Sequence, residues 1–164
     1  MNRFMIVVNP DKDTDSTVTN RIQSYLEAHG AACMVRDVFH LESSDWEALK
    51  KEQFDCVLVL GGDGTLLRMA GETEDIDIPL FGINLGTVGF LTEGEVANIE
   101  EILDRLLTDD FTIEERMMVT GTVTKADGTT YRKSALNDIV ISRAGFSRLI
   151  GLNVSVDGQV LDTY

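Results

Sequence analysis

The segment Gly61–Thr65, with the sequence GGDGT, combines three glycines with one carboxylate. Apolar residues 56–60 predict a buried strand before it, and residues 66–70 predict the start of a helix after it. Successive backbone N–H groups in such a turn can bind phosphate oxygens. Asp63 could accept a proton from an attacking hydroxyl or bind magnesium. The alternative is a purely structural turn in which Asp63 caps the helix.

A second glycine-containing segment, residues 84–91, follows another apolar stretch at residues 79–83. Two such loops at neighbouring strand ends would face one crevice, since ligands bind at the carboxyl ends of parallel strands. The spacing of Gly82, Gly86 and Gly89 is four and three, which does not match the dinucleotide fingerprint Gly-x-Gly-x-x-Gly. The sequence also contains no Gly-Lys-Ser or Gly-Lys-Thr, which a Walker loop requires.

Two adjacent polar residues, Asn137 and Asp138, interrupt an apolar stretch within residues 130–142, which we predict to be a strand. Neighbouring residues of a strand point to opposite faces, so one of the two should lie on a covered face. Buried polar side chains need hydrogen-bonding partners. A ligand with hydroxyl groups is one candidate partner, and a turn at the end of a hairpin is the alternative interpretation.

The elements that must position these residues alternate between strand and helix up to about residue 108. We expect strands at 4–8, 31–35, 56–60 and 79–83 and helices at 16–29, 45–52 with Asp45 as N-cap, from 66 onward, and at 96–107. This alternation predicts an α/β fold with a doubly wound, mostly parallel sheet.

Beyond residue 110 the pattern changes to strands without helices. Residues 117–125, 130–142 and 149–156 are rich in Val, Ile and Thr. Asp127-Gly128 and Asp157-Gly158 are hairpin turn signals. We therefore expect two domains: an α/β nucleotide-binding domain at 1–110 and the first part of an antiparallel β domain at 111–164.

The composition limits the classes of partner. The net charge is −14, from 14 basic and 28 acidic residues, which disfavours nucleic acid and anionic membranes. No apolar stretch approaches the roughly 20 residues that span a bilayer, and the N-terminal one is too short for a signal peptide. We expect a cytoplasmic protein. Cys33 and Cys56 lie in apolar runs, as expected for buried, reduced thiols.

Together, these motifs resemble the NAD kinase family. The similarity covers the chain from about residue 4 to its end and rests on residues 61–67 (GGDGTLL), 82–92, Glu115-Arg116 and 135–138 (ALND). Diacylglycerol and sphingosine kinases share the first motif, so the second and fourth favour NAD kinase. A lipid kinase would also favour an apolar or basic membrane-facing surface, which the net charge opposes.

The resemblance implies a Rossmann-like, phosphofructokinase-like fold. It implies transfer of the γ-phosphoryl group of ATP, or a phosphoryl group of inorganic polyphosphate, to the 2′-hydroxyl of the adenosine ribose of NAD, giving NADP. Mg²⁺ would neutralise phosphate charge, and Asp63 would accept the hydroxyl proton. By similarity, the residues that bind NAD or nucleotide are Gly61, Gly62, Asp63, Gly64, Thr65, Asn84, Gly86, Phe90, Asn137, Asp138 and Arg148. The full-length protein is expected to be a homo-oligomer.

The family pattern continues with an Asp-Gly segment and a Gly-Ser-Thr-Ala-Tyr-type loop, and this sequence stops at Tyr164, short of both. We expect a chain truncated within its β domain that binds NAD poorly and has little kinase activity. Its exposed strand edges could pair with another copy or aggregate. A non-catalytic nucleotide-binding module is the alternative from a different functional class.

Overall fold

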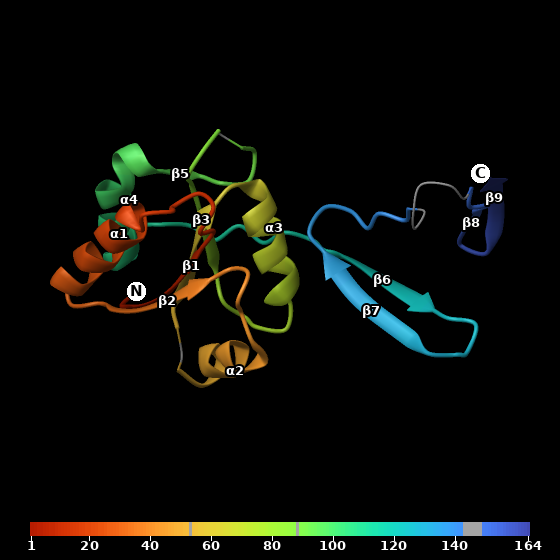
Figure 1. Ribbon diagram of the computed structural model, residues 1–164, viewed down its shortest axis with the longest axis horizontal. Coiled ribbons are helices and arrows are strands. Elements are labelled where there is room, and N and C mark those ends of the chain that lie inside the picture. Colours follow the sequence, from red (N-terminus) through yellow and green to blue (C-terminus); the bar gives the residue numbers. More distant parts are fainter. Residues whose placement is uncertain (53, 88, 143–148) are drawn as a thin grey trace.

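The computed structural model describes residues 1–52, 54–87, 89–142 and 149–164. The first two-thirds of the chain form a five-stranded parallel sheet with helices on both faces (Figure 1). In the order β2-β1-β3-β4-β5, the strands are Ala32–Asp37, Arg3–Val8, Cys56–Gly61, Leu80–Asn84 and Gly94–Glu95. The helices are α1 (Thr17–Ala28), α2 (Ser43–Glu52), α3 (Asp63–Glu72) and α4 (Ile99–Leu107), the last preceded by the 3₁₀ turn η1 (Val96–Asn98).

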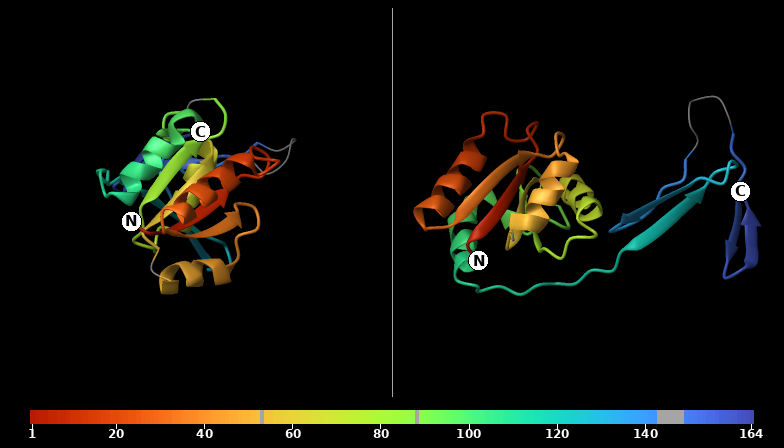
Figure 2. Two further views of the ribbon diagram at one scale, coloured as in Figure 1. Left: turned by 90° about the vertical axis from the view of Figure 1, so that its left-hand side faces the viewer. Right: turned by 90° about the horizontal axis from the view of Figure 1, so that it is seen from below.

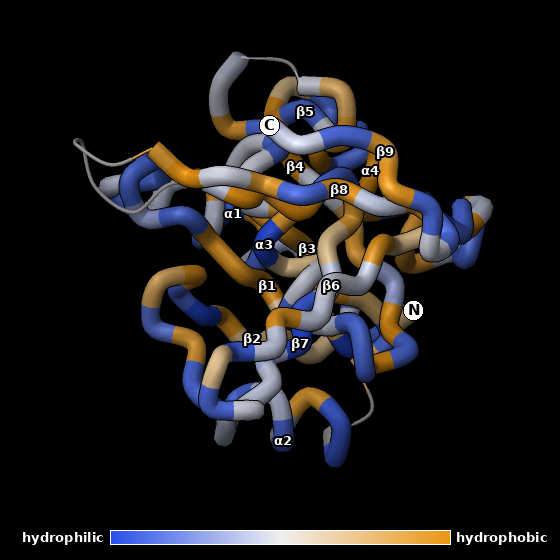
Figure 3. Tube along the Cα trace, turned by 90° about the vertical axis from the view of Figure 1, so that its right-hand side faces the viewer, coloured by the Kyte–Doolittle hydropathy of each residue, from blue (hydrophilic) through white to orange (hydrophobic). Residues whose placement is uncertain are grey.

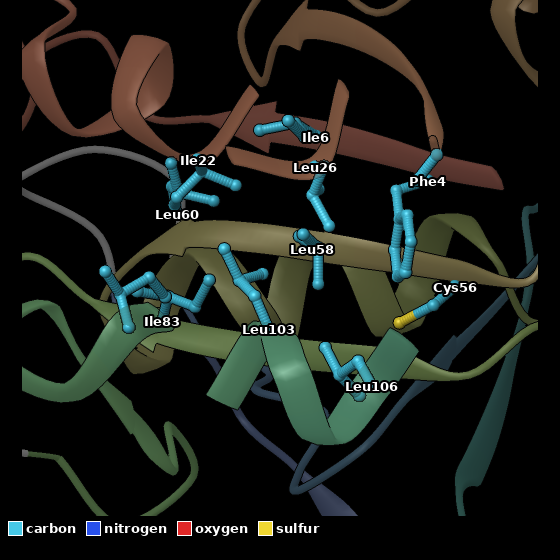
Figure 4. Close-up of a cluster of buried hydrophobic side chains, with 12 residues drawn as sticks. Phe4, Ile6, Ile22, Leu26, Cys56, Leu58, Leu60, Ile83, Leu103 and Leu106 are labelled. Carbon is cyan, nitrogen blue, oxygen red and sulfur yellow. The ribbon is translucent and has the colours of Figure 1, made fainter. Parts of the chain in front are cut away.

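Alternate residues of the central strands enter two separate cores. Phe4 and Leu58 pack with residues of α1 and α4 on one face (Figure 4). Met5 and Val57 pack with residues of α2 and α3 on the other. All four side chains are fully buried, which explains why β1 and β3 are apolar without alternation. The prediction of a doubly wound α/β fold is confirmed.

The strand order places ligand-binding loops at a definite point of the sheet. From β1 the chain moves to β2 on one side, and then crosses to β3 on the other side of β1. The carboxyl ends of β1 and β3 therefore flank the topological switch point, where open α/β sheets bind ligands. The backbone N–H of Asn9, which follows β1, donates to the carbonyl of Leu60 in β3 at 2.9 Å.

Some predicted helix limits and strands differ from the observed ones. Helix α3 begins at Asp63 rather than at Leu66, so the carboxylate lies in its first turn. Helix α2 begins at Ser43, and Asp45 as its N-cap is wrong. Asp45 instead accepts the backbone N–H of Glu42 from the third helical position, as the acidic member of a capping box does. The two-residue strand β5 was not predicted, since so short a pairing leaves no periodic pattern.

Two antiparallel hairpins follow the α/β unit and extend away from it (Figure 2). They pair β6 (Val119–Thr124) with β7 (Thr130–Ala135), and β8 (Asn153–Val156) with β9 (Gln159–Thr163). Both predicted turns are confirmed. Gly128 has φ +84°, and Asp157 and Gly158 have φ 50° and 79°, as a type I′ turn requires. The change of architecture falls between α4 and β6, and the division into domains at residue 110 stays a prediction.

The strand predicted for residues 130–142 is too long. Strand β7 ends at Ala135, and Asn137 and Asp138, which follow it, are both exposed. The expectation that one of them lies on a covered face is therefore wrong, because no strand pairing continues to position them. Large apolar side chains are also exposed in this part of the chain, and Figure 3 shows hydrophobic residues recurring along the trace of β8 and β9.

Both cysteines are free, as predicted. Cys56 is buried, and Cys33 is partly buried. Burial raises the pKa of Cys33 to about 11 and that of Cys56 to about 12, so both stay protonated thiols at neutral pH. Among the described residues, no helix combines the length and the apolar character needed to cross a membrane.

Candidate functional site

The first glycine loop is a tight turn from β3 into α3. The side chain of Thr65 folds back over Gly61, so that a Cβ added at Gly61 would lie 2.7 Å from the Cβ of Thr65. The carbonyl of Gly62 accepts the backbone N–H groups of Thr65 and Leu66 at 3.0 and 3.2 Å. Only glycine therefore fits at position 61, and the first turn of α3 starts immediately beyond it.

Asp63 connects this loop to the second one. Its Oδ2 accepts the backbone N–H of Phe90 at 2.8 Å. Its Oδ1 accepts the N–H groups of Leu91 and Thr92 at 3.1 and 3.3 Å, and the hydroxyl of Thr92 at 3.4 Å. A Cβ at Gly89 would overlap the carboxylate, so this contact also explains a glycine of the second loop.

These hydrogen bonds determine the charge of Asp63. The N–H of Phe90 contributes most, and with those of Leu91 and Thr92 it holds the pKa of the Asp63 carboxyl below its ordinary value. The first turn of α3 also favours a negative charge. The group is therefore ionised at neutral pH. Within the described residues, Oδ2 accepts a single hydrogen bond, which leaves it able to accept a proton from a substrate hydroxyl.

The second loop lies beside the first along the sheet. Asn84 pairs in register with Gly61, and the N–H of Leu85 donates to the carbonyl of Gly61 at 2.8 Å. The buried side chain of Asn84 accepts the N–H of Gly86 at 3.0 Å. Phe90, in contrast, is fully exposed. The two loops are therefore neighbours at the carboxyl ends of β3 and β4, and the expectation that they face one crevice stays a prediction.

A cavity of about 290 Å³, which we call the switch-point cavity, lies at the carboxyl ends of β1, β2 and β3. Its walls are formed by Asn9, Lys12, Val38, Phe39, Gly62, Gly64, Thr65 and Arg68. The glycine motif predicted the three lining residues from the GGDGT segment, whereas no motif predicted Asn9, Lys12 or Arg68. The available signal was that Asn9 directly follows a buried strand, where ligand-binding loops begin.

A second cavity of about 250 Å³, the seam cavity, lies between α3 and the end of β7. Its walls are formed by Leu67, Arg68, Gly71, Glu72 and residues 133–138. Asn137 and Asp138 line it, so they do not share the switch-point cavity with Gly62 and Gly64. Arg68 lines both cavities.

Close packing and an ion pair hold this seam together. A Cβ at Gly71 would lie 3.4 Å from the carbonyl oxygen of Ser134, so α3 approaches β7 closely there. Lys133 and Glu72 form an ion pair at 3.7 Å. Arg148, the remaining predicted site residue, lies outside the described residues. In the described part of the chain, no cluster of three or more His, Cys, Asp or Glu side chains is arranged to bind a metal.

Known proteins resemble this chain in sequence and in structure. The family model for the ATP-NAD kinase N-terminal domain matches residues 4–111. The chain is 40% identical to an NAD kinase of Lachnoclostridium phytofermentans over 168 residues, and 38% identical to one of Lachnospira eligens over 169 residues. All of this chain is covered, but it spans only 59% and 58% of those relatives.

A solved structure, yeast NADH kinase complexed with NADH, has the same fold. It superposes with a TM-score of 0.75 at 18% sequence identity. The match covers 99% of this chain and 55% of the yeast protein.

Proposed function

The chain belongs to the NAD kinase family, and from this premise we propose that the protein transfers a phosphoryl group to the 2′-hydroxyl of the adenosine ribose of NAD, giving NADP. The observation that carries the proposal is the position of Asp63. This ionised carboxylate joins the two glycine loops at the carboxyl ends of the parallel strands, where open α/β sheets bind ligands.

The reaction needs little covalent chemistry from the protein. The ribose oxygen forms a bond to the terminal phosphorus of the donor, and the bond from that phosphorus to its bridging oxygen breaks. The bond's electron pair leaves with the shortened donor, and the hydroxyl proton moves to Oδ2 of Asp63. Catalysis then consists of positioning and charge neutralisation. A base with a low pKa suits this reaction, since the transition state is loose and the proton can leave late.

The seam cavity is the candidate site for NAD. Asn137 and Asp138 can hydrogen-bond ribose or nicotinamide groups, and the exposed ring of Phe90 can stack on adenine. The yeast relative was solved with NADH, a ligand of the same chemistry. Magnesium would enter as a complex with the donor, because Mg²⁺ is bound mostly by phosphates, waters and one or two carboxylates. ATP and inorganic polyphosphate are both compatible donors.

The test is NADP formation from NAD, MgATP or Mg-polyphosphate by the complete gene product and its Asp63→Asn variant. We expect the turnover number to fall by about 100-fold or more, as is typical when a positioned base is lost. Asp75→Asn, which changes an exposed aspartate in the loop after α3, is the matched control and should leave the rate unchanged. Normal turnover by the Asp63→Asn variant would show that Asp63 is not the base.

We also propose that the 164-residue chain alone has weak activity. Asn137, Asp138 and Phe90 are exposed, so the acceptor side of the site is open to solvent. The relatives have more sequence than this chain spans. The comparison is the same assay on the 164-residue chain and on the complete gene product. Equal turnover by the two proteins would contradict this proposal.

A further inference from the structure

Thr92 is a polar side chain buried where the second glycine loop leads into β5. Its side chain is 9% exposed. Its hydroxyl donates to Oδ1 of Asp63 at 3.4 Å, and its backbone N–H donates to the same oxygen at 3.3 Å. A buried hydroxyl needs a hydrogen-bonding partner, and the partner of this one is the carboxylate of the candidate base. Thr92 therefore contacts Asp63 directly, although it lines neither of the two cavities.

The methyl group of Thr92 determines where its hydroxyl points. A Cβ added at Gly82 in β4 would lie 3.0 Å from this methyl carbon and 3.2 Å from the Cα of Thr92. The same Cβ would lie 3.1 Å from a methyl carbon of Leu66 in α3. Thr92 thus packs over the bare backbone of Gly82, and a β-branched side chain in such a place has few rotamers. Because packing holds the methyl group on Gly82, the hydroxyl stays directed at Asp63.

The backbone beside Thr92 is anchored to the sheet. Strand β5 pairs in parallel with β4, and Gly94 lies opposite Ile83. A Cβ at Gly94 would lie 2.8 Å from a ring carbon of Phe81 and 3.2 Å from the side chain of Ile83, so the two strands approach closely there. The short strand β5 therefore holds Thr92 against the sheet, and Gly82 leaves the space that its side chain occupies.

The two oxygens of the Asp63 carboxylate are held unequally. Among the described residues, Oδ1 accepts hydrogen bonds from the N–H of Leu91 and from the N–H and hydroxyl of Thr92. Oδ2 accepts the N–H of Phe90. The Thr92 hydroxyl is the side-chain donor among these groups, so a substitution can remove it without altering the backbone. Because these donors restrict rotation of the carboxylate, Oδ2 is the oxygen that keeps capacity for a further proton.

We propose that Thr92 is a positioning residue for Asp63: its hydroxyl and N–H hold Oδ1, so that Oδ2 is presented to the 2′-hydroxyl of the acceptor. This inference rests on the proposed function. The proton of the ribose hydroxyl moves to Oδ2 while the ribose oxygen bonds to phosphorus. The orientation of Oδ2 therefore decides how often a bound acceptor is aligned to react. Thr92 acts on the reaction through Asp63, as a supporting hydrogen bond to a base does.

The experiment compares Thr92→Val and Thr92→Ser in the complete gene product. Valine keeps the branched shape of threonine and lacks the hydroxyl, whereas serine keeps the hydroxyl and lacks the methyl group. The kcat and the KM for NAD are measured with saturating MgATP. We expect Thr92→Val to lower kcat by about 10-fold and to change KM for NAD by less than about twofold, because a misaligned base slows the reaction without weakening acceptor binding. Thr92→Ser should keep kcat within about threefold of the wild type, since its hydroxyl can still donate to Oδ1.

Stability separates positioning from structural support. Thr92→Ser loses the methyl packing on Gly82, so its melting temperature should fall by about 2–4 °C while kcat is kept. Thr73→Val is the matched control, because Thr73 is also buried and its hydroxyl donates to the carbonyl of Met69 at 2.9 Å, at the other end of α3. This control should change neither kcat nor KM. An equal loss of kcat in Thr92→Val and Thr92→Ser would overturn the inference, since a structural role does not depend on the hydroxyl.

A second measurement does not depend on the reaction. Crystal structures of the wild type and of Thr92→Val should show the Asp63 carboxylate in one orientation in the first and rotated, or in two orientations, in the second. If the wild type makes no NADP but the carboxylate turns in Thr92→Val, the kinase proposal fails and the positioning contact stands. If NADP is formed and Thr92→Val keeps the wild-type kcat, the kinase proposal stands and the role of Thr92 is rejected. An unchanged carboxylate in Thr92→Val would reject it as well.

Discussion

The α/β unit and the β6–β9 region contain similar β-branched residues but bury them very differently. Val57 and Val59 in β3 are fully buried, whereas Val123 in β6 is 57% exposed and Val160 in β9 is 81% exposed. Strand β3 lies between two other strands and beneath helices on both faces. Each strand of the hairpins has one neighbour. Apolar sequence therefore yields a stable core only where the topology supplies covering layers.

This contrast runs through the candidate site. The two glycine loops are positioned by the packed unit and contact each other through Asp63. Asn137 and Asp138 belong to the open region and reach the site only across the contact of α3 with β7. The proposed acceptor side therefore depends on how well this seam is maintained.

The largest effect should come from removing core volume in the packed unit. Leu58→Ala should lower the free energy of unfolding by about 3 kcal/mol, because the Leu58 side chain of β3 is fully buried beneath α1 and α4. Val123→Ala in β6 is the matched truncation in the open region and should cost less than about 0.5 kcal/mol. Urea denaturation measures both. Equal costs would show that β6 is covered in solution.

A glycine substitution tests whether the two glycine loops are as tightly packed as the core. Gly89→Ala should destabilise by about 1–3 kcal/mol, because its Cβ would overlap the Asp63 carboxylate. Gly151→Ala, in the open region, has no atom within 4 Å of its Cβ and should change stability by less than about 0.5 kcal/mol. If thermal unfolding shows no difference between the two, the contact between Asp63 and the second loop is not rigid.

The Asp63 contacts should also give a pH-dependent stability. The folded-state pKa of Asp63 lies below its ordinary value of 3.8. Ionised Asp63 therefore stabilises the folded protein at pH values above 3.8, and this stabilisation is lost as the pH falls through the folded-state pKa. The melting temperature of the wild type should exceed that of Asp63→Asn at pH 7. The difference should shrink below about pH 4. A constant difference from pH 7 to pH 3 would contradict the carboxylate's role in holding the loop.

The smallest effect concerns the seam. Lys133→Ala removes the ion pair with Glu72. Because both side chains are partly exposed and their N–O distance is 3.7 Å, the free energy of unfolding should change by less than about 0.5 kcal/mol. Local hydrogen exchange of β7 amides should nevertheless accelerate, because the hairpin loses one attachment to α3. Lys125→Ala, in the exposed hairpin turn, is the control. Unchanged β7 exchange would mean that packing of Gly71 on Ser134 suffices.

Most of the packed region, and less of the open one, could be predicted from the sequence, for a physical reason. Strands covered on both faces need continuous apolar runs, and β1, β3 and β4 have them. The exposed strands need no continuous apolar run, so no sequence pattern marks the end of β7 at Ala135. The hairpin turns were predictable because Gly128 and Gly158 need positive φ, a local property of the backbone.

By itself, the sequence determined the α/β alternation, the GGDGT turn and the candidate role of Asp63, because periodicity and glycine are local constraints. The tertiary structure alone decided which distant residues meet. It placed β1 beside β3, brought the second loop onto Asp63, and turned Lys12 and Arg68 toward one cavity. Strand order and the convergence of side chains depend on how whole layers pack, and no short stretch of sequence records them.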